Sequence, residues 1–149
     1  MNTDTVRYYL QDLEYMDKLI EKLKAELDEF RKMQVDNIKI PIVTGMPGVH
    51  NNTSNIEEIV INRVIEIEKR ERQLFELILL RGCIEDALGY VREDTAIDYI
   101  LKDRYLQEQG KKKTFWQIAA KRNFNCGGLK VEDNRFMNKI LCMIKQKPG

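Results

Sequence analysis

Apolar residues recur at alternating spacings of three and four in the first part of the chain, and this pattern constrains the fold most. Charged residues fill most positions between them. Such spacing aligns one apolar stripe along a helix that must pair with another helix. It predicts one continuous helix from Thr5 to about Met33, capped by Thr3 or Asp4. The stripe consists of Val6, Tyr9, Leu13, Met16, Ile20, Leu23, Leu27 and Phe30.

A second long helix is expected after a loop. Residues 34–55 combine two prolines and two glycines with an Asn, Thr and Ser cluster, which indicates a flexible loop. Helical periodicity resumes near Ser54 or Asn55 and persists to about Leu88. Two helices joined in this way predict a long antiparallel, coiled-coil-like hairpin over residues 1–92, and a homodimer that forms through it.

Three shorter helices are expected in residues 93–149, so the predicted fold class is all-α. The periodicity places them at 95–106, 115–123 and 130–145. A glycine-containing turn, 123–129, precedes the last of them. This order predicts a small three-helix unit with a helix-turn-helix.

The charge of the chain is strongly polarised. From Lys102 onward there are 12 Lys and Arg residues against 4 Asp and Glu, about +8, whereas the preceding residues have 13 against 20, about −7. A basic segment of this kind on a helix-turn-helix indicates double-stranded DNA as the partner. The main alternative is a protein-interaction adaptor, or an inhibitor of a host protein, because a basic surface also binds acidic proteins.

The segment LKDRYLQEQGKKKTFWQIAAKRNF carries a resemblance to a known family. It is similar to small phage-encoded late-transcription regulators of the autolysin-regulator (ArpU) and RinA type, whose C-terminal part resembles region 4 of sigma factors. The resemblance implies sequence-specific DNA binding at a phage or prophage operon, with RNA polymerase as a further partner. The matching positions are Leu101, Arg104, Tyr105, Gly110, Thr114, Phe115, Ile118 and Ala119.

Two features depart from the family pattern. The turn over 123–129 is longer than the usual three or four residues. Glu132 and Asp133 also stand where the start of the recognition helix would carry Ser or Thr, and carboxylates oppose phosphate. The sequence therefore predicts phosphate contacts more firmly than base recognition by the last helix.

The candidate DNA contacts form two groups. Basic residues around the second and third short helices would neutralise phosphates. Polar residues of the last helix, three and four apart, share a face suited to base edges. Trp116 is expected to pack against other helices. The expected phosphate contacts are Lys111, Lys112, Lys113, Lys121, Arg122 and Lys130, and the expected base contacts are Arg135, Asn138 and Lys139.

The sequence offers no candidate catalytic group, so we expect neither an enzyme nor a cofactor. Cys83, Cys126 and Cys142 are widely spaced and the single histidine is distant from them, which argues against a metal site. Cys83 and Cys142 are expected in the core. No apolar run could span a membrane and no secretory signal is visible, which indicates a cytoplasmic protein. The resemblance to phage regulators implies that this cytoplasm is that of a bacterial host.

Overall fold

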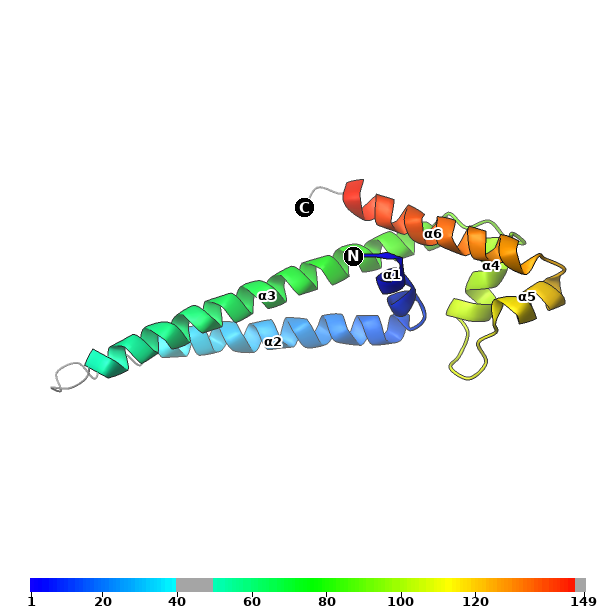
Figure 1. The fold of residues 1–149 in the computed structure, drawn as a ribbon. Coiled ribbons are helices and arrows are strands. Elements are labelled where there is room, and N and C mark those ends of the chain that lie inside the picture. Colours follow the sequence, from blue (N-terminus) through cyan, green and yellow to red (C-terminus); the bar gives the residue numbers. More distant parts are fainter. Residues whose placement is uncertain (40–49, 147–149) are drawn as a thin grey trace. The chain divides into compact units, whose positions relative to one another are not determined.

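The computed structural model describes the backbone of residues 1–39 and 50–146, and the side chains of 1–32 and 56–146. These parts are helical and contain no strand, which confirms the all-α prediction (Figure 1). The elements are α1 (Thr3–Leu10), α2 (Leu13–Lys39), α3 (His50–Gly89), α4 (Ala96–Ile100), the π-helical η1 (Leu101–Tyr105), α5 (Phe115–Arg122) and α6 (Cys126–Gln146).

The prediction of one continuous N-terminal helix is wrong. Asn2, rather than Thr3 or Asp4, caps α1, and the helix ends at Leu10. Asp12 then accepts a hydrogen bond from the amide of Tyr15 at 3.0 Å and caps a new helix. Because Val6 and Leu10 are fully buried and α1 packs against α6, tertiary contacts take α1 out of the hairpin seam.

The expected loop over 34–55 is shorter than predicted. Residues 34–39 continue α2, and residues 50–55 belong to α3, so the second long helix begins at His50 rather than near Ser54. Its end at Gly89 agrees with the predicted end near Leu88. The part of the predicted loop from 40 to 49 lies outside the described residues.

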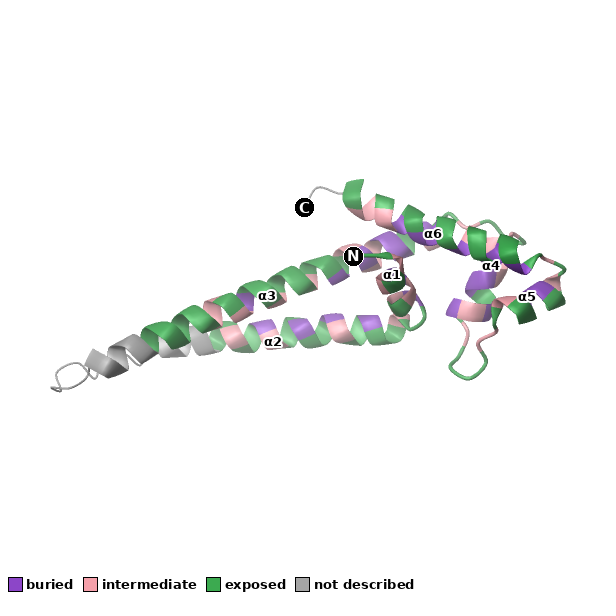
Figure 2. Cartoon of the chain, viewed as in Figure 1, coloured by how far each residue is buried: buried purple, intermediate pink, exposed green. Residues whose placement is uncertain are grey.

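Residues 18–77 form one of two compact units, here called the hairpin unit. In it α2 and α3 pack side by side in opposite directions, with buried α2 positions along one side of the helix (Figure 2). Arg70 joins the two helices: its guanidinium lies 3.2 Å from Glu26 and 4.5 Å from the ring centroid of Phe30. The buried apolar residues are Ile20, Leu23, Leu27, Ile67 and Leu77.

Residues 1–17 and 78–149 form the other compact unit, here called the C-terminal unit. This division differs from the predicted boundary at residue 92, because the first and last parts of the expected hairpin share a core with the shorter helices. α6 packs against α1, α4 and α5. The core therefore centres on α6, and its fully buried members include Leu80, Ile84, Ile100, Ile118, Met137 and Ile140.

A buried polar cluster lies in the same core. Asp133 of α6 is 2% exposed and accepts hydrogen bonds from the Tyr105 hydroxyl at 2.5 Å and from Nε of Arg7 at 3.0 Å. Burial, and then the hydrogen bond to this carboxylate, raise the pKa of Tyr105. Asp133 therefore ties α1 and η1 to α6, a role that its position in the sequence did not indicate.

Candidate nucleic-acid interface

The first helix of the candidate motif, α5, has a strong N-terminal cap. The amide of Gln117 donates to the Thr114 hydroxyl at 3.2 Å, and the amide of Thr114 donates to the Gln117 side chain at 2.9 Å. This reciprocal pair satisfies amides that a helix start leaves without partners. It explains why α5 begins directly after the lysine run, as the sequence predicted.

The turn between α5 and α6 has three residues, so the predicted long turn is wrong. Asn123 ends α5 in the left-handed conformation, at φ 60° and ψ 37°, which asparagine tolerates. The side chain of Asn125 accepts from the amide of Gly127 at 2.9 Å and caps α6, which begins at Cys126. The turn length is therefore that of a typical helix-turn-helix.

The early start of α6 changes the position of the two carboxylates that were expected at its tip. Glu132 and Asp133 lie beyond the first turn, and Asp133 points into the core. Glu132 lies 3.0 Å from Arg135 in an i,i+3 ion pair. The first turn instead contains Gly127 and Gly128, and the predicted conflict with phosphate at the helix tip disappears.

The sequence contained a signal for this early start. Apolar or buried positions recur at helical spacing back to the beginning of α6, namely Cys126, Leu129, Asp133, Phe136, Met137 and Ile140. The adjacent glycines Gly127 and Gly128 obscured the pattern, because glycine weakens any prediction of helix.

The outer face of α6 carries the predicted polar residues. Lys130, Arg135, Asn138 and Lys139 are all exposed. The ammonium of Lys139 lies 5.5 Å from the ring centroid of Tyr90. The structure therefore brings these four residues together on one helix, with their side chains available to a partner; they are called the α6 face below.

Lys111 and Lys112, adjacent in the run before α5, have different surroundings. Lys111 is exposed and lies 3.1 Å from Glu108. Nζ of Lys112 donates to the backbone carbonyls of Gln11, Arg104 and Tyr105 at 2.8, 3.3 and 2.7 Å. Burial lowers the pKa of Lys112. The structure thus places Lys112 in an internal contact, not on the surface that was expected to meet phosphate.

Lys121 and Arg122 also differ in their exposure and their contacts. Arg122 is half-buried: its Nε lies 3.6 Å from Asp103, and its guanidinium 4.1 Å from the ring centroid of Tyr99. Lys121 is exposed, and its contact with Lys113 lowers the pKa of Lys121. Two neighbouring ammonium groups of this kind attract an anion more strongly than one does.

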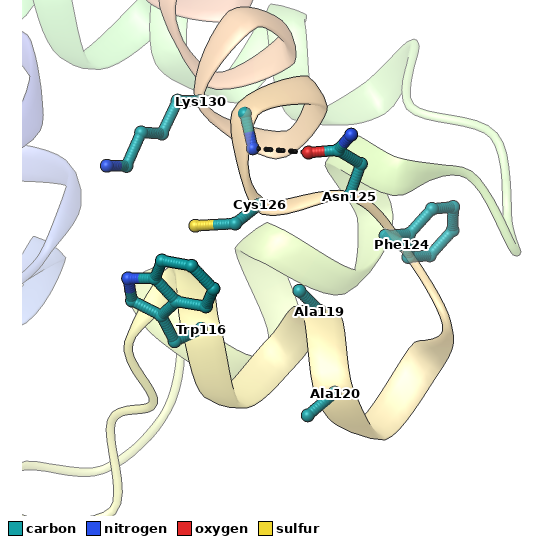
Figure 3. Close-up of a pocket in the computed structure, with 8 residues that line it drawn as sticks. Trp116, Ala119, Ala120, Phe124, Asn125, Cys126 and Lys130 are labelled. Atoms are coloured by element: carbon teal, nitrogen blue, oxygen red, sulfur yellow. Dashed lines mark hydrogen bonds between the residues drawn. The ribbon is translucent and has the colours of Figure 1, made fainter.

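A hollow with a volume of about 530 Å³ is lined by residues of α5, of the turn and of the start of α6 (Figure 3). Trp116 is 73% exposed, so the expectation that it packs against another helix is wrong. Its ring lies on the same side of the hollow as the side chains of Cys126 and Lys130. The hollow therefore combines apolar surface with one cation, and the remaining residues around it are Ala119, Ala120, Phe124, Asn125 and Gly127.

The cysteines agree with prediction only in part. Cys83 is fully buried, as expected, whereas Cys142 is exposed and Cys126 is buried instead. Among residues 1–39 and 50–146, no helix combines the length and apolarity needed to cross a membrane.

Comparisons with known proteins give no relative. No protein-family model, curated protein or solved structure matches the chain. Any functional conclusion therefore depends on the geometry of the helices and the chemistry of their exposed residues.

The cap of α6 provides a first test of this geometry. Asn125→Ala is expected to lower the free energy of unfolding by about 1 kcal/mol, because the amide of Gly127 loses its acceptor. Urea unfolding followed by circular dichroism measures the change. Asn138→Ala, on the exposed face of the same helix, serves as the control, and an equal loss in both variants would contradict the three-residue turn.

Proposed function

We propose that this protein is a DNA-binding transcriptional regulator, of the kind found in phages and prophages, in which α6 enters the major groove. The observation that carries the proposal is the short turn from α5 to α6, followed by an outer face with Lys130, Arg135 and Asn138. Arginine and asparagine make bidentate contacts to guanine and adenine edges. Because Asp133 is buried and Glu132 is paired with Arg135, the carboxylates of α6 repel DNA phosphates less than the sequence suggested.

The start of α6 suits a phosphate. By helix geometry, the amides of Cys126 and Gly128 have no acceptor within the helix, and Gly128 has no side chain to hinder approach. Lys130 lies on the next turn. In this proposal the helix start and Lys130 hold one backbone phosphate, while Arg135 and Asn138 contact bases.

The phosphate contacts are proposed for fewer residues than the sequence indicated. Lys111, Lys113 and Lys121 keep exposed or half-exposed ammonium groups and remain candidates. Lys112 and Arg122 have internal partners, so they support the domain rather than meet DNA. Lys139 stays a candidate at the far side of the α6 face.

The test begins with duplexes that the full chain selects from a random library, followed by fluorescence anisotropy at several salt concentrations. Lys130→Ala is expected to weaken binding about fivefold for every duplex and to lower the salt slope by about 1. Asn138→Ala should instead reduce the preference for the selected duplex, because base contacts provide specificity.

Lys24→Ala is the matched control, since it removes one exposed lysine from α2 of the hairpin unit. It should leave DNA affinity within about twofold. The proposal fails if no duplex binds below micromolar concentration in moderate salt, or if Lys130→Ala and Lys24→Ala behave alike.

The hollow beside Trp116 favours a second candidate function, that of an adaptor or inhibitor that binds a protein such as RNA polymerase. An exposed aromatic ring beside apolar residues is typical of protein interfaces. Trp116 is the single tryptophan of the chain, so its fluorescence reports directly on occupancy. A change on addition of purified polymerase, without any duplex binding, would favour this alternative.

A further inference from the structure

The two helices of the hairpin unit differ in their outer surfaces. Among the side chains described for residues 18–77, every exposed large apolar residue belongs to α3 and none to α2. Within this unit the apolar side of α2 is therefore used in the contact with α3, whereas α3 has further apolar residues on its surface. The exposed residues are Ile56, Ile59, Val60, Ile61, Ile65 and Phe75.

Five exposed residues of α3 form a regular pattern, called the α3 stripe below: Ile61, Ile65, Glu68, Arg72 and Phe75. Its members are spaced by four, three, four and three residues, as in a coiled-coil seam. At 3.6 residues per turn they lie within about 80° of the helix circumference. Ile61 is 58%, Ile65 42% and Phe75 51% exposed.

The centre of the α3 stripe is self-complementary about Arg70. Ile65 and Phe75 lie five residues before and after this position, and Glu68 and Arg72 lie two residues before and after it. A two-fold rotation at Arg70 therefore exchanges an apolar position with an apolar one, and a carboxylate with a guanidinium. Such a surface matches a second copy of itself.

We propose that the α3 stripe binds the same stripe of a second copy of this chain, with the two α3 helices antiparallel and the two-fold axis crossing the stripe midway between Glu68 and Arg72. Ile65 then packs against the partner's Phe75, and Glu68 faces the partner's Arg72. The rotation repeats both contacts, so the interface has two apolar pairs around two ion pairs. Ile61 extends the apolar surface at each end.

The charges favour the antiparallel orientation. In a parallel pair in register, Glu68 would face the partner's Glu68 and Arg72 the partner's Arg72, and such like-charge contacts are destabilising. Among the side chains of residues 1–32 and 56–146, neither Glu68 nor Arg72 forms an ion pair, and both are exposed, so both are available to a partner.

Other charged groups near the axis are balanced within each chain. Glu71 lies 3.0 Å from Arg31, and Lys69 lies 3.9 Å from Glu66. Arg70 points to the opposite side of α3, where it contacts Glu26 and Phe30. The axis therefore does not bring unbalanced charges of one sign together. The proposal is independent of DNA binding, because it involves the hairpin unit alone.

Charge reversal tests both the dimer and its orientation in the full chain. Sedimentation equilibrium should show a dimer for the wild type. Glu68→Arg alone, or Arg72→Glu alone, should weaken dimerisation at least about tenfold, because each single change creates two like-charge contacts. The double variant E68R/R72E should return to within about threefold of the wild type, because the exchanged charges again face opposite ones.

Spin-label distances give a second readout that does not depend on affinity. Cys142→Ser serves as the background. Measured along the α3 helix axis, two labels at Gln73→Cys should lie about 9 Å apart, and two labels at Glu58→Cys about 36 Å apart. Parallel pairing would make the two separations equal. The proposal is overturned by equal separations, by a wild-type monomer up to about 100 µM, or by single and double variants with the same dimer affinity. A monomer would leave the α3 stripe to a different protein.

Discussion

Asp133→Ala is expected to lower the free energy of unfolding by about 3 kcal/mol. The carboxylate is 2% exposed and accepts from both Tyr105 and Arg7, so its removal leaves the buried Tyr105 hydroxyl and Nε of the half-buried Arg7 without their acceptor. Because α1 and η1 both contact α6 through Asp133, the loss should affect the whole C-terminal unit. Urea unfolding followed by circular dichroism measures it.

Glu132→Ala is the matched control on the adjacent residue. Glu132 is half-exposed and forms an i,i+3 ion pair with Arg135, so its removal should change the free energy of unfolding by no more than about 0.5 kcal/mol. The loss in Asp133→Asn should lie between the losses in Asp133→Ala and Glu132→Ala. The amide oxygen of the new side chain can still accept from Tyr105, but its NH2 group cannot accept from Arg7. A loss below 1 kcal/mol in Asp133→Ala would contradict a structural role for the cluster.

Lys112→Met is expected to lower the free energy of unfolding by about 2 kcal/mol, because three backbone carbonyls lose a charged donor. Two of them, from Arg104 and Tyr105, lie at the end of η1, and the third, from Gln11, follows α1. A cation at helix carboxyl ends also offsets their partial negative charge. Thermal or urea unfolding measures the effect.

The neighbouring Lys111→Met provides the control, since Lys111 is exposed and forms an i,i+3 ion pair with the exposed Glu108. The free energy of unfolding of Lys111→Met should stay within about 0.5 kcal/mol of the wild-type value. On the DNA-binding proposal, Lys112→Met should bind a selected duplex as tightly as the wild type does, under conditions where both variants are folded. A folded Lys112→Met protein with weakened DNA binding and unchanged stability would place Lys112 at the interface instead.

The sequence predicted the hairpin well wherever a helix face determines burial. Ile20, Leu23 and Leu27 follow the heptad spacing and are buried between α2 and α3. The spacing could not show that the helix breaks at Gln11 and Asp12, because Val6 and Leu13 keep the same register on both sides of the break. The contact of α1 with α6 decided that break.

The candidate site was predicted in composition but not in arrangement. Lys111 and Lys112 are adjacent residues of one run, and no local pattern distinguishes an exposed ammonium from one that reaches three carbonyls. The start of α6 was misplaced because Gly127 and Gly128 mask a helix that the side chain of Asn125 caps. For Lys112 the contact with Gln11, distant in the sequence, determines the outcome, whereas the start of α6 depends on the local cap by Asn125.

Periodicity and charge, both properties of the sequence by itself, determined that this protein is all-α, that two long helices pair, and that its last third is basic. Tertiary structure decided which of these features are internal. It buried Asp133 against Tyr105 and Arg7, it bound the ammonium of Lys112 to backbone carbonyls, and it left Trp116 and the α3 stripe exposed. The physical reason is that a repeat fixes which side chains share a helix face, whereas the burial of that face depends on which helix packs against it.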